Sequence, residues 1–189
     1  MDVLGISGSP KIDGLTNLLW DKALEGARAS GAHTEKIILN DLNFRPCQEC
    51  GGCGKTGVCI LGDDMKSVYE SIAGADAVVV ASPIYFASLT AQLKSMIDRC
   101  HSLWIAKYIF KNSPLTKKRH KGLFLCVGGK DSDIYFENAK KIIKTFFITL
   151  DIEYSSDLFV GGLNAMPADS PKRRAAIEKA FQLGANLVK

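Results

Sequence analysis

The sequence has few of the features that a membrane-bound or secreted protein would need. No run reaches the ~18 consecutive apolar residues of a membrane span, and the first residues lead into a strand-like apolar run instead of a signal peptide. Neither sign of charge is in large excess, because 24 Lys and Arg nearly balance 20 Asp and Glu. The densest basic run, residues 117–121, precedes an apolar run and is expected to be a solvated loop. We expect a cytoplasmic protein with no membrane and no nucleic-acid partner.

The usual hydrolytic constellations are missing as well. The sequence contains no Ser-His-Asp order, no His-Glu-x-x-His motif and no carboxylate dyad, and its three histidines, His33, His101 and His120, are isolated. Each histidine is expected to be structural or solvated. We therefore name no catalytic side chain, which is compatible with chemistry that a bound cofactor supplies.

Short apolar runs alternate with longer amphipathic segments. The apolar runs are expected to be strands, at about residues 3–6, 34–39, 77–81, 122–127 and 153–160. The amphipathic segments are expected to be helices, at about residues 16–30, 64–73, 89–104, 133–150 and 171–188. Strict alternation predicts a doubly wound α/β fold, a parallel sheet with helices on both faces. Five strands favour the flavodoxin-like order 2-1-3-4-5, in a single domain over residues 1–189 with a cysteine-rich loop inserted at about 43–62.

The loop after the first strand has the composition of a phosphate site. Small hydroxyl residues, glycines and one lysine precede a helix, where backbone N–H groups face an anion; a plain turn with a helix cap is the alternative. The run Gly-Ser-Pro-Lys-x-x-Gly-x-Thr closely resembles the phosphate loop of the NADPH-dependent FMN reductase family. The family often has Asn where Leu15 stands. By resemblance, the residues that bind the FMN phosphate are Ser7, Ser9, Lys11, Thr16 and Asn17.

The loops after the third and fourth strands are candidates for the flavin ring. Residues 82–99 are similar to the second signature of the same family, and a hydrophobic loop packed over the sheet end is the alternative. The resemblance implies that the ribityl chain and the ring contact Ser82, Pro83, Ile84, Tyr85, Phe86 and Ala87. It also implies that Lys94, Asp98 and Arg99 hold the following helix and shape a subunit interface. Gly128 and Gly129 are expected at the pyrimidine edge of the flavin, with a left-handed turn as an equal alternative.

Four of the six cysteines fall within thirteen residues, in the spacing Cys47-x2-Cys50-x2-Cys53-x5-Cys59. Clustered cysteines in a reducing compartment indicate metal or redox chemistry, and this spacing resembles the compact motif of the archaeal and bacterial iron-sulfur flavoproteins. In that family a [4Fe-4S] cluster passes electrons to FMN. Unmetallated thiols, a disulfide and a zinc site remain alternatives. Cys100 and Cys126 are expected to be small core residues.

These features favour an FMN-binding redox protein, and three hypotheses follow from them. The first is a reductase that uses NAD(P)H to reduce small acceptors such as quinones or free flavin. The second is an electron carrier that takes electrons from a ferredoxin through a [4Fe-4S] cluster, and the third is a non-redox binding module. Family resemblance also implies a homodimer or homotetramer in which a neighbouring chain covers the flavin.

Overall fold

A computed structural model describes residues 1–113, 115 and 120–189. Residues 117–119 of the basic run lie outside this described part. The strands are β1 (Asp2–Ser7), β2 (His33–Ile38), β3 (Ala77–Pro83), β4 (His120–Val127) and β5 (Ile152–Val160). The helices are α1 (Leu15–Ala29), α2 (Met65–Gly74), α3 (Ala91–Arg99), α4 (His101–Tyr108), α5 (Asp133–Thr149) and α6 (Pro171–Leu187).

The sheet confirms the predicted flavodoxin-like fold. Its five strands run in the order β2-β1-β3-β4-β5, and each neighbouring pair is parallel. The central strand β3 is buried along almost its whole length, as its uninterrupted apolar sequence predicts. Strand β2, with its mixed sequence, lies at an edge. Helix α1 ends before Gly31, whose φ of +91° suits the glycine expected there.

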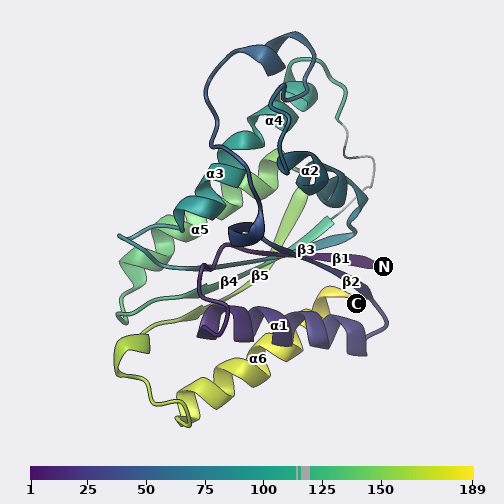
Figure 1. The fold of residues 1–189 in the computed structure, drawn as a ribbon. Coiled ribbons are helices and arrows are strands. Elements are labelled where there is room, and N and C mark those ends of the chain that lie inside the picture. Colours follow the sequence, from purple (N-terminus) through teal and green to yellow (C-terminus); the bar gives the residue numbers. More distant parts are fainter. Residues whose placement is uncertain (114, 116–119) are drawn as a thin grey trace.

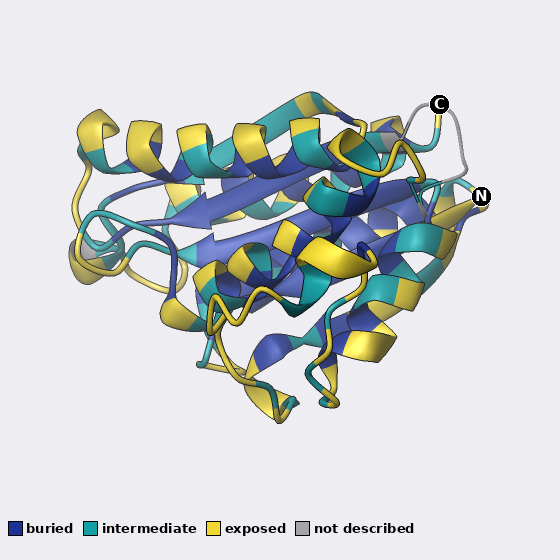
Figure 2. Cartoon of the chain, turned by 90° about the horizontal axis from the view of Figure 1, so that it is seen from above, coloured by how far each residue is buried: buried dark blue, intermediate teal, exposed yellow. Residues whose placement is uncertain are grey.

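Helices cover both faces of the sheet (Figure 1). Helices α1 and α6 pack on one face, and α2, α3, α4 and α5 lie on the other. Side chains alternate between the two cores along each strand, so that Val78 and Val80 face the second group while Val79 and Ala81 face the first. Figure 2 shows the buried strands between helices whose outer faces are exposed. Cys100 and Cys126 lie in the core, as expected.

The segment predicted as one helix over 89–104 is two helices, and this is a correction. The carbonyl of Arg99 accepts hydrogen bonds from the hydroxyls of Tyr69, at 3.0 Å, and Ser102, at 3.3 Å. The amide of Leu103 bonds instead to the carbonyl of Cys100. The regular hydrogen-bond pattern is therefore interrupted where α3 meets α4, because side chains compete for the acceptor.

The cysteine-rich segment forms a long excursion above the helices of one face (Figure 1). It contains only one short 3-10 turn, Gly52–Lys55, before α2 begins. Within the described part of the chain, no helix is both long and apolar enough to cross a membrane.

Candidate functional site

The loops predicted to hold the flavin meet at one edge of the sheet. The last residue of β1, Ser7, lies beside Ala81 of β3, and Pro83 lies beside Val127 of β4. The carboxyl ends of three adjacent strands therefore present their loops side by side, at the point where the strand order reverses.

Two of the expected phosphate residues shape the first loop from within. The Ser7 hydroxyl donates to Oδ1 of Asn17 at 2.5 Å. The Asn17 amide donates to the carbonyls of Lys11 and Ile12, at 3.0 and 3.2 Å. Ser7 and Asn17 are both buried, so they fix the path of the loop around the start of α1.

Other groups of this loop remain available to an anion. Helix α1 begins after Gly14, which has no side chain to cap it, and the N–H groups of a first helical turn lack partners within the helix. Thr16 lies in that turn and is buried, while Lys11 is exposed beside it. The Ser9 hydroxyl bonds to the backbone of Lys11. Backbone amides, a hydroxyl and a cation thus surround one helix N-terminus.

Thr90 joins the first loop to the second, a role that the sequence reading missed. Its hydroxyl donates to the carbonyl of Gly8 at 2.7 Å, and it accepts from the Leu93 amide as the N-cap of α3. The Thr90 amide donates to the Ser82 hydroxyl at 3.3 Å. A threonine before an amphipathic segment is the signal that could have indicated the cap; the contact with Gly8 has no local signal.

The second loop ends in a tight turn that projects from the sheet. The backbones of Tyr85 and Ser88 bond to each other in both directions, and the two residues between them, Phe86 and Ala87, have φ of +47° and +59°. A bulky residue in that region is strained. The Asn138 amide of α5 holds the Ala87 carbonyl at 2.7 Å. The turn leaves Phe86 fully exposed and Tyr85 half-exposed, as an apolar surface at the strand ends.

Gly128 and Gly129 do not form a left-handed turn, because neither has a positive φ. The Gly128 amide donates to the Val160 carbonyl at 2.9 Å. A Cβ on Gly129 would lie 2.8 Å from Oδ1 of Asn164. A side chain at position 129 would therefore require the exposed Asn164 side chain to move.

The base of the cysteine loop is held by carboxylates. Asp64 accepts from the Asn43 amide at 2.6 Å, and Asp63 accepts from the Arg45 amide at 3.2 Å. The Asp64 side chain makes no cap hydrogen bond to α2. The Asp63 carboxylate, which is paired with Arg99, also accepts from the backbone amide of Met65, the first residue of α2, at 3.2 Å.

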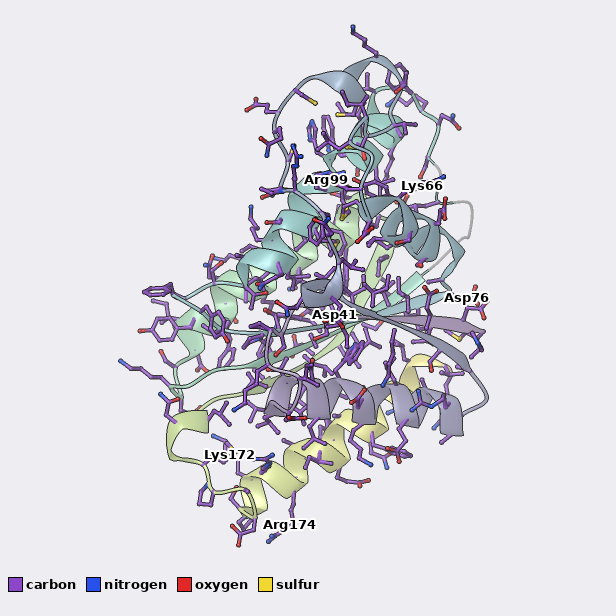
Figure 3. The ribbon with its side chains drawn as sticks, viewed as in Figure 1. Asp41, Lys66, Asp76, Arg99, Lys172 and Arg174 are labelled. Carbon is purple, nitrogen blue, oxygen red and sulfur yellow. The ribbon has the colours of Figure 1, made fainter. Side chains whose placement is uncertain are left out.

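Arg99 is a buried anchor, which corrects the expectation that it shapes a subunit interface. Its guanidinium bonds to both carboxylate oxygens of Asp63, at 2.7 and 2.9 Å, and to the Arg45 carbonyl at 2.7 Å. Figure 3 shows Arg99 directly below the cysteine loop. Lys94 and Asp98 instead pair with each other on the exposed side of α3.

The four clustered cysteines line one cavity of about 290 Å³. All are free thiols; Cys47 and Cys50 are exposed, and Cys53 and Cys59 are half-buried. Arg99 and residues of α4 close the cavity. In the described part of the chain, no group of three or more His, Cys, Asp or Glu side chains is placed to hold a single metal ion.

The ionisable groups around the cavity shift one another's pKa values. Burial raises the pKa of the Cys53 thiol, and the nearby Cys59, Cys47 and Cys50 raise that pKa further. The Arg99 hydrogen bond holds the pKa of Asp63 below its ordinary value. Burial lowers the pKa of Arg99, but Asp63, with Tyr69 and Cys59 beside it, holds the pKa above its ordinary value. The cavity therefore has one permanent cation at its floor.

The flavin loops and the thiol cavity occupy opposite ends of α3. Thr90 caps the start of this helix and Arg99 ends it, nine positions later, which is about 14 Å along a helix axis. Two groups bound at these places would be held by separate sets of residues.

Comparison with known proteins identifies the family of the chain. The sequence profile of the NADPH-dependent FMN reductase family matches residues 1–133. An iron-sulfur flavoprotein of Methanosarcina thermophila is 30% identical over 169 residues, which is 89% of this chain and 85% of that protein. Another, of Methanocaldococcus jannaschii, is 34% identical over 149 residues, 78% of this chain and 71% of that protein.

A solved structure shares the fold. The NAD(P)H:quinone oxidoreductase of Methanothermobacter marburgensis superposes with a TM-score of 0.74 at 20% identity, over 100% of this chain and 98% of that one. The matched sequence profile covers well over half of the chain, including the first and second loops. The chain therefore belongs to the NADPH-dependent FMN reductase family and is an FMN-dependent oxidoreductase.

Proposed function

We propose that the protein is an iron-sulfur flavoprotein that carries electrons between a [4Fe-4S] cluster and FMN. The observation that carries this proposal is the placement of Cys47, Cys50, Cys53 and Cys59 around one cavity. A Cys-x2-Cys-x2-Cys run with a fourth cysteine is the thiolate set that cubane clusters use. The iron-sulfur flavoproteins among the relatives support the same conclusion.

The residues at the cavity fit a cluster better than a zinc ion. Both zinc and a cubane cluster can bind four thiolates, and a Cys-x2-Cys-x2-Cys run with a fourth cysteine is the spacing that clusters use. A cluster has several irons, so its four thiolates can stand further apart around a larger space. The buried Nε of Arg99 makes no hydrogen bond of regular geometry among the described residues, and the Cys59 side chain lies beside the guanidinium. A donor in this place suits the sulfur atoms of an anionic group.

The loops at the strand ends are proposed to hold FMN. Amides at the start of α1, with Lys11 and Thr16, would bind the phosphate, while Ser7 and Asn17 keep the loop in shape. Pro83–Ala87 would contact the ribityl chain and the ring, and Gly128–Gly129 would lie at its polar edge. FMN, when bound, supplies the redox chemistry. The chain's own residues at the strand ends would hold and orient it.

A protein donor of the ferredoxin type is proposed to deliver the electrons. Cys47 and Cys50 are exposed, so a cluster at this cavity would lie close to the surface that such a donor can reach. The second candidate is an NAD(P)H-dependent reductase of small acceptors. The name of the matched family, which specifies NADPH dependence, favours that candidate.

Absorbance of the anaerobically purified protein tests the proposal. The account predicts flavin bands on a broad absorbance from the cluster, and bleaching by reduced ferredoxin but not by NADH or NADPH. Flavin bands alone, with rapid bleaching by NADPH, would contradict the carrier and favour the reductase. Absorbance from neither group would leave a binding module that has kept the fold.

A further inference from the structure

Arg99 connects the two ends of the cysteine loop. The Arg45 carbonyl that it contacts lies two residues before Cys47, and the Asp63 carboxylate lies four residues after Cys59. A bidentate pair fixes the plane of the guanidinium as well as its position. One side chain from the end of α3 therefore sets where the loop starts and where it ends.

Arg99 also faces the cavity that the loop encloses. The residue is 2% exposed and lines the same cavity as the four clustered cysteines. Its two terminal nitrogens are used by Asp63 and Arg45, whereas its Nε makes no hydrogen bond of regular geometry among the described residues. The Cys59 side chain nevertheless lies close enough to the guanidinium to raise its pKa as a hydrogen-bond partner. Buried donors without partners are rare in proteins and call for an explanation.

We propose that Arg99 is a positioning residue for the iron-sulfur cluster, holding the cysteine loop through Asp63 and donating from Nε to a sulfur atom in the cavity. This inference rests on the proposed function, since it assigns a role toward the cluster. The role is distinct from binding the metal, because a guanidinium cannot serve as an iron ligand and remains protonated.

Two neighbouring charges of opposite sign make the proposal testable. A cluster held by four thiolates is anionic, and its reduction adds one more negative charge. The Arg99 cation and its Nε–H stabilise that extra charge, while the Asp63 carboxylate opposes it. Removing Arg99 should therefore lower the midpoint potential of the cluster, and removing the Asp63 charge should raise the potential.

The experiment measures the midpoint potential by anaerobic redox titration, together with iron per chain, for the parent, Arg99→Gln and Asp63→Asn. We expect opposite shifts, each corresponding to about a tenfold change in the redox equilibrium, which is 59 mV for one electron. Arg99→Lys restores the charge without the planar fork, and we expect the iron content to recover toward that of the parent while the potential recovers only in part. Lys94→Gln is the matched control, because it removes a cation from the exposed side of the same helix. For this variant we expect less than a twofold change in the redox equilibrium.

A purely structural role gives different results. If Arg99 only held the loop closed, both Arg99→Gln and Asp63→Asn would loosen it, so the two potentials would move in the same direction or stay unchanged; either result overturns the inference. If Arg99→Gln fails to fold, the direction of the shift in Asp63→Asn decides. A parent protein that holds FMN but no iron after anaerobic reconstitution overturns the proposed function itself, and this inference with it.

Discussion

In the first loop, single residues divide into those that shape the loop and those left for a ligand. Ser7 and Asn17 are hydrogen-bonded to each other and to the loop, whereas the Lys11 side chain is exposed. Lys11→Ala combined with Thr16→Val should weaken FMN at least tenfold, because hydrogen bonds to a charged group contribute about 1.5 to 3 kcal/mol each. Riboflavin, which has no phosphate, should lose much less.

Calorimetric titration of the apo-protein with each flavin measures this difference. Ser155→Ala, an exposed change on β5, is the control and should leave both affinities unchanged. An equal loss for FMN and riboflavin would contradict the assignment of the phosphate site.

The Arg99–Asp63 ion pair makes the free energy of unfolding depend on pH. The folded-state pKa of Asp63 lies below its ordinary value of 3.8, because Arg99 stabilises the carboxylate. Its contribution is therefore present above about pH 4 and is lost as the pH falls through the folded pKa. Asp63→Asn should reduce the free energy of unfolding by about 2 kcal/mol at neutral pH, with a smaller difference from the parent at about pH 3.

Urea unfolding of the parent and the variant at both pH values measures the effect. Asp98→Asn breaks an exposed pair on α3 and should cost less than about 1 kcal/mol. A constant difference between parent and Asp63→Asn at all pH values would rule out the buried ion pair as its source.

Residue types and spacing were enough to place the expected flavin residues at one sheet edge, but not to assign their partners. Thr90 binds the carbonyl of Gly8, 82 positions away, and Asn138 binds that of Ala87, 51 positions away. Family resemblance implied that Arg99 shapes an interface. Its actual partner, Asp63, lies 36 positions earlier in the sequence. Contacts of this kind depend on the finished fold and leave no local signal.

Elements, in contrast, could mostly be predicted, because alternation of apolar runs and amphipathic segments is a local property. The strand order, the edge position of β2 and the two helical layers all agree with the prediction. The break between α3 and α4 could not be predicted, because the Tyr69 hydroxyl that donates a hydrogen bond to the Arg99 carbonyl comes from α2. Amphipathic periodicity continues through the break, so the sequence resembles that of one helix.

Helices α1 and α6 approach each other through two glycines. A Cβ on Gly184 would lie 1.8 Å from the Ala23 carbonyl oxygen, and one on Gly26 would lie 2.0 Å from the Phe181 carbonyl oxygen. In an ordinary helix Gly→Ala stabilises by up to about 1 kcal/mol. Here Gly184→Ala should instead destabilise by about 3 kcal/mol or more, because backbone must move apart.

Thermal and urea unfolding of Gly184→Ala measure this cost. Gly62→Ala is the control, since nothing lies within 4 Å of its Cβ position and its φ is not positive. A Gly184→Ala variant as stable as the parent would show that the two helices are not in such close contact.

For the whole molecule, exposed apolar surface near the cysteine loop predicts self-association. Trp104 and Tyr108 of α4 lie in contact, with ring centroids 5.4 Å apart, and they are exposed together with Ile109 and Phe110. Exposed apolar side chains gathered at the end of one helix favour an interface. We expect a dimer or tetramer by light scattering at micromolar concentration, and Trp104→Glu should shift it toward the monomer. A monomeric parent at that concentration would contradict the expectation.

The central claim is that one chain holds FMN at the strand ends and a cluster at the far end of α3. Cys53→Ser should remove most of the iron and leave FMN bound, because the two groups use separate residues. The matched control is Cys100→Ser, a buried cysteine outside the cluster motif; it should retain both groups if it folds.

The most direct test counts iron, acid-labile sulfide and FMN per chain after anaerobic purification and reconstitution of the parent and of Cys53→Ser. The account predicts about four irons and four sulfides per chain in the parent, with one FMN, and loss of the iron and sulfide but not of FMN in the variant. A parent that binds FMN and no iron, or a Cys53→Ser variant that keeps its full iron content, would contradict the account.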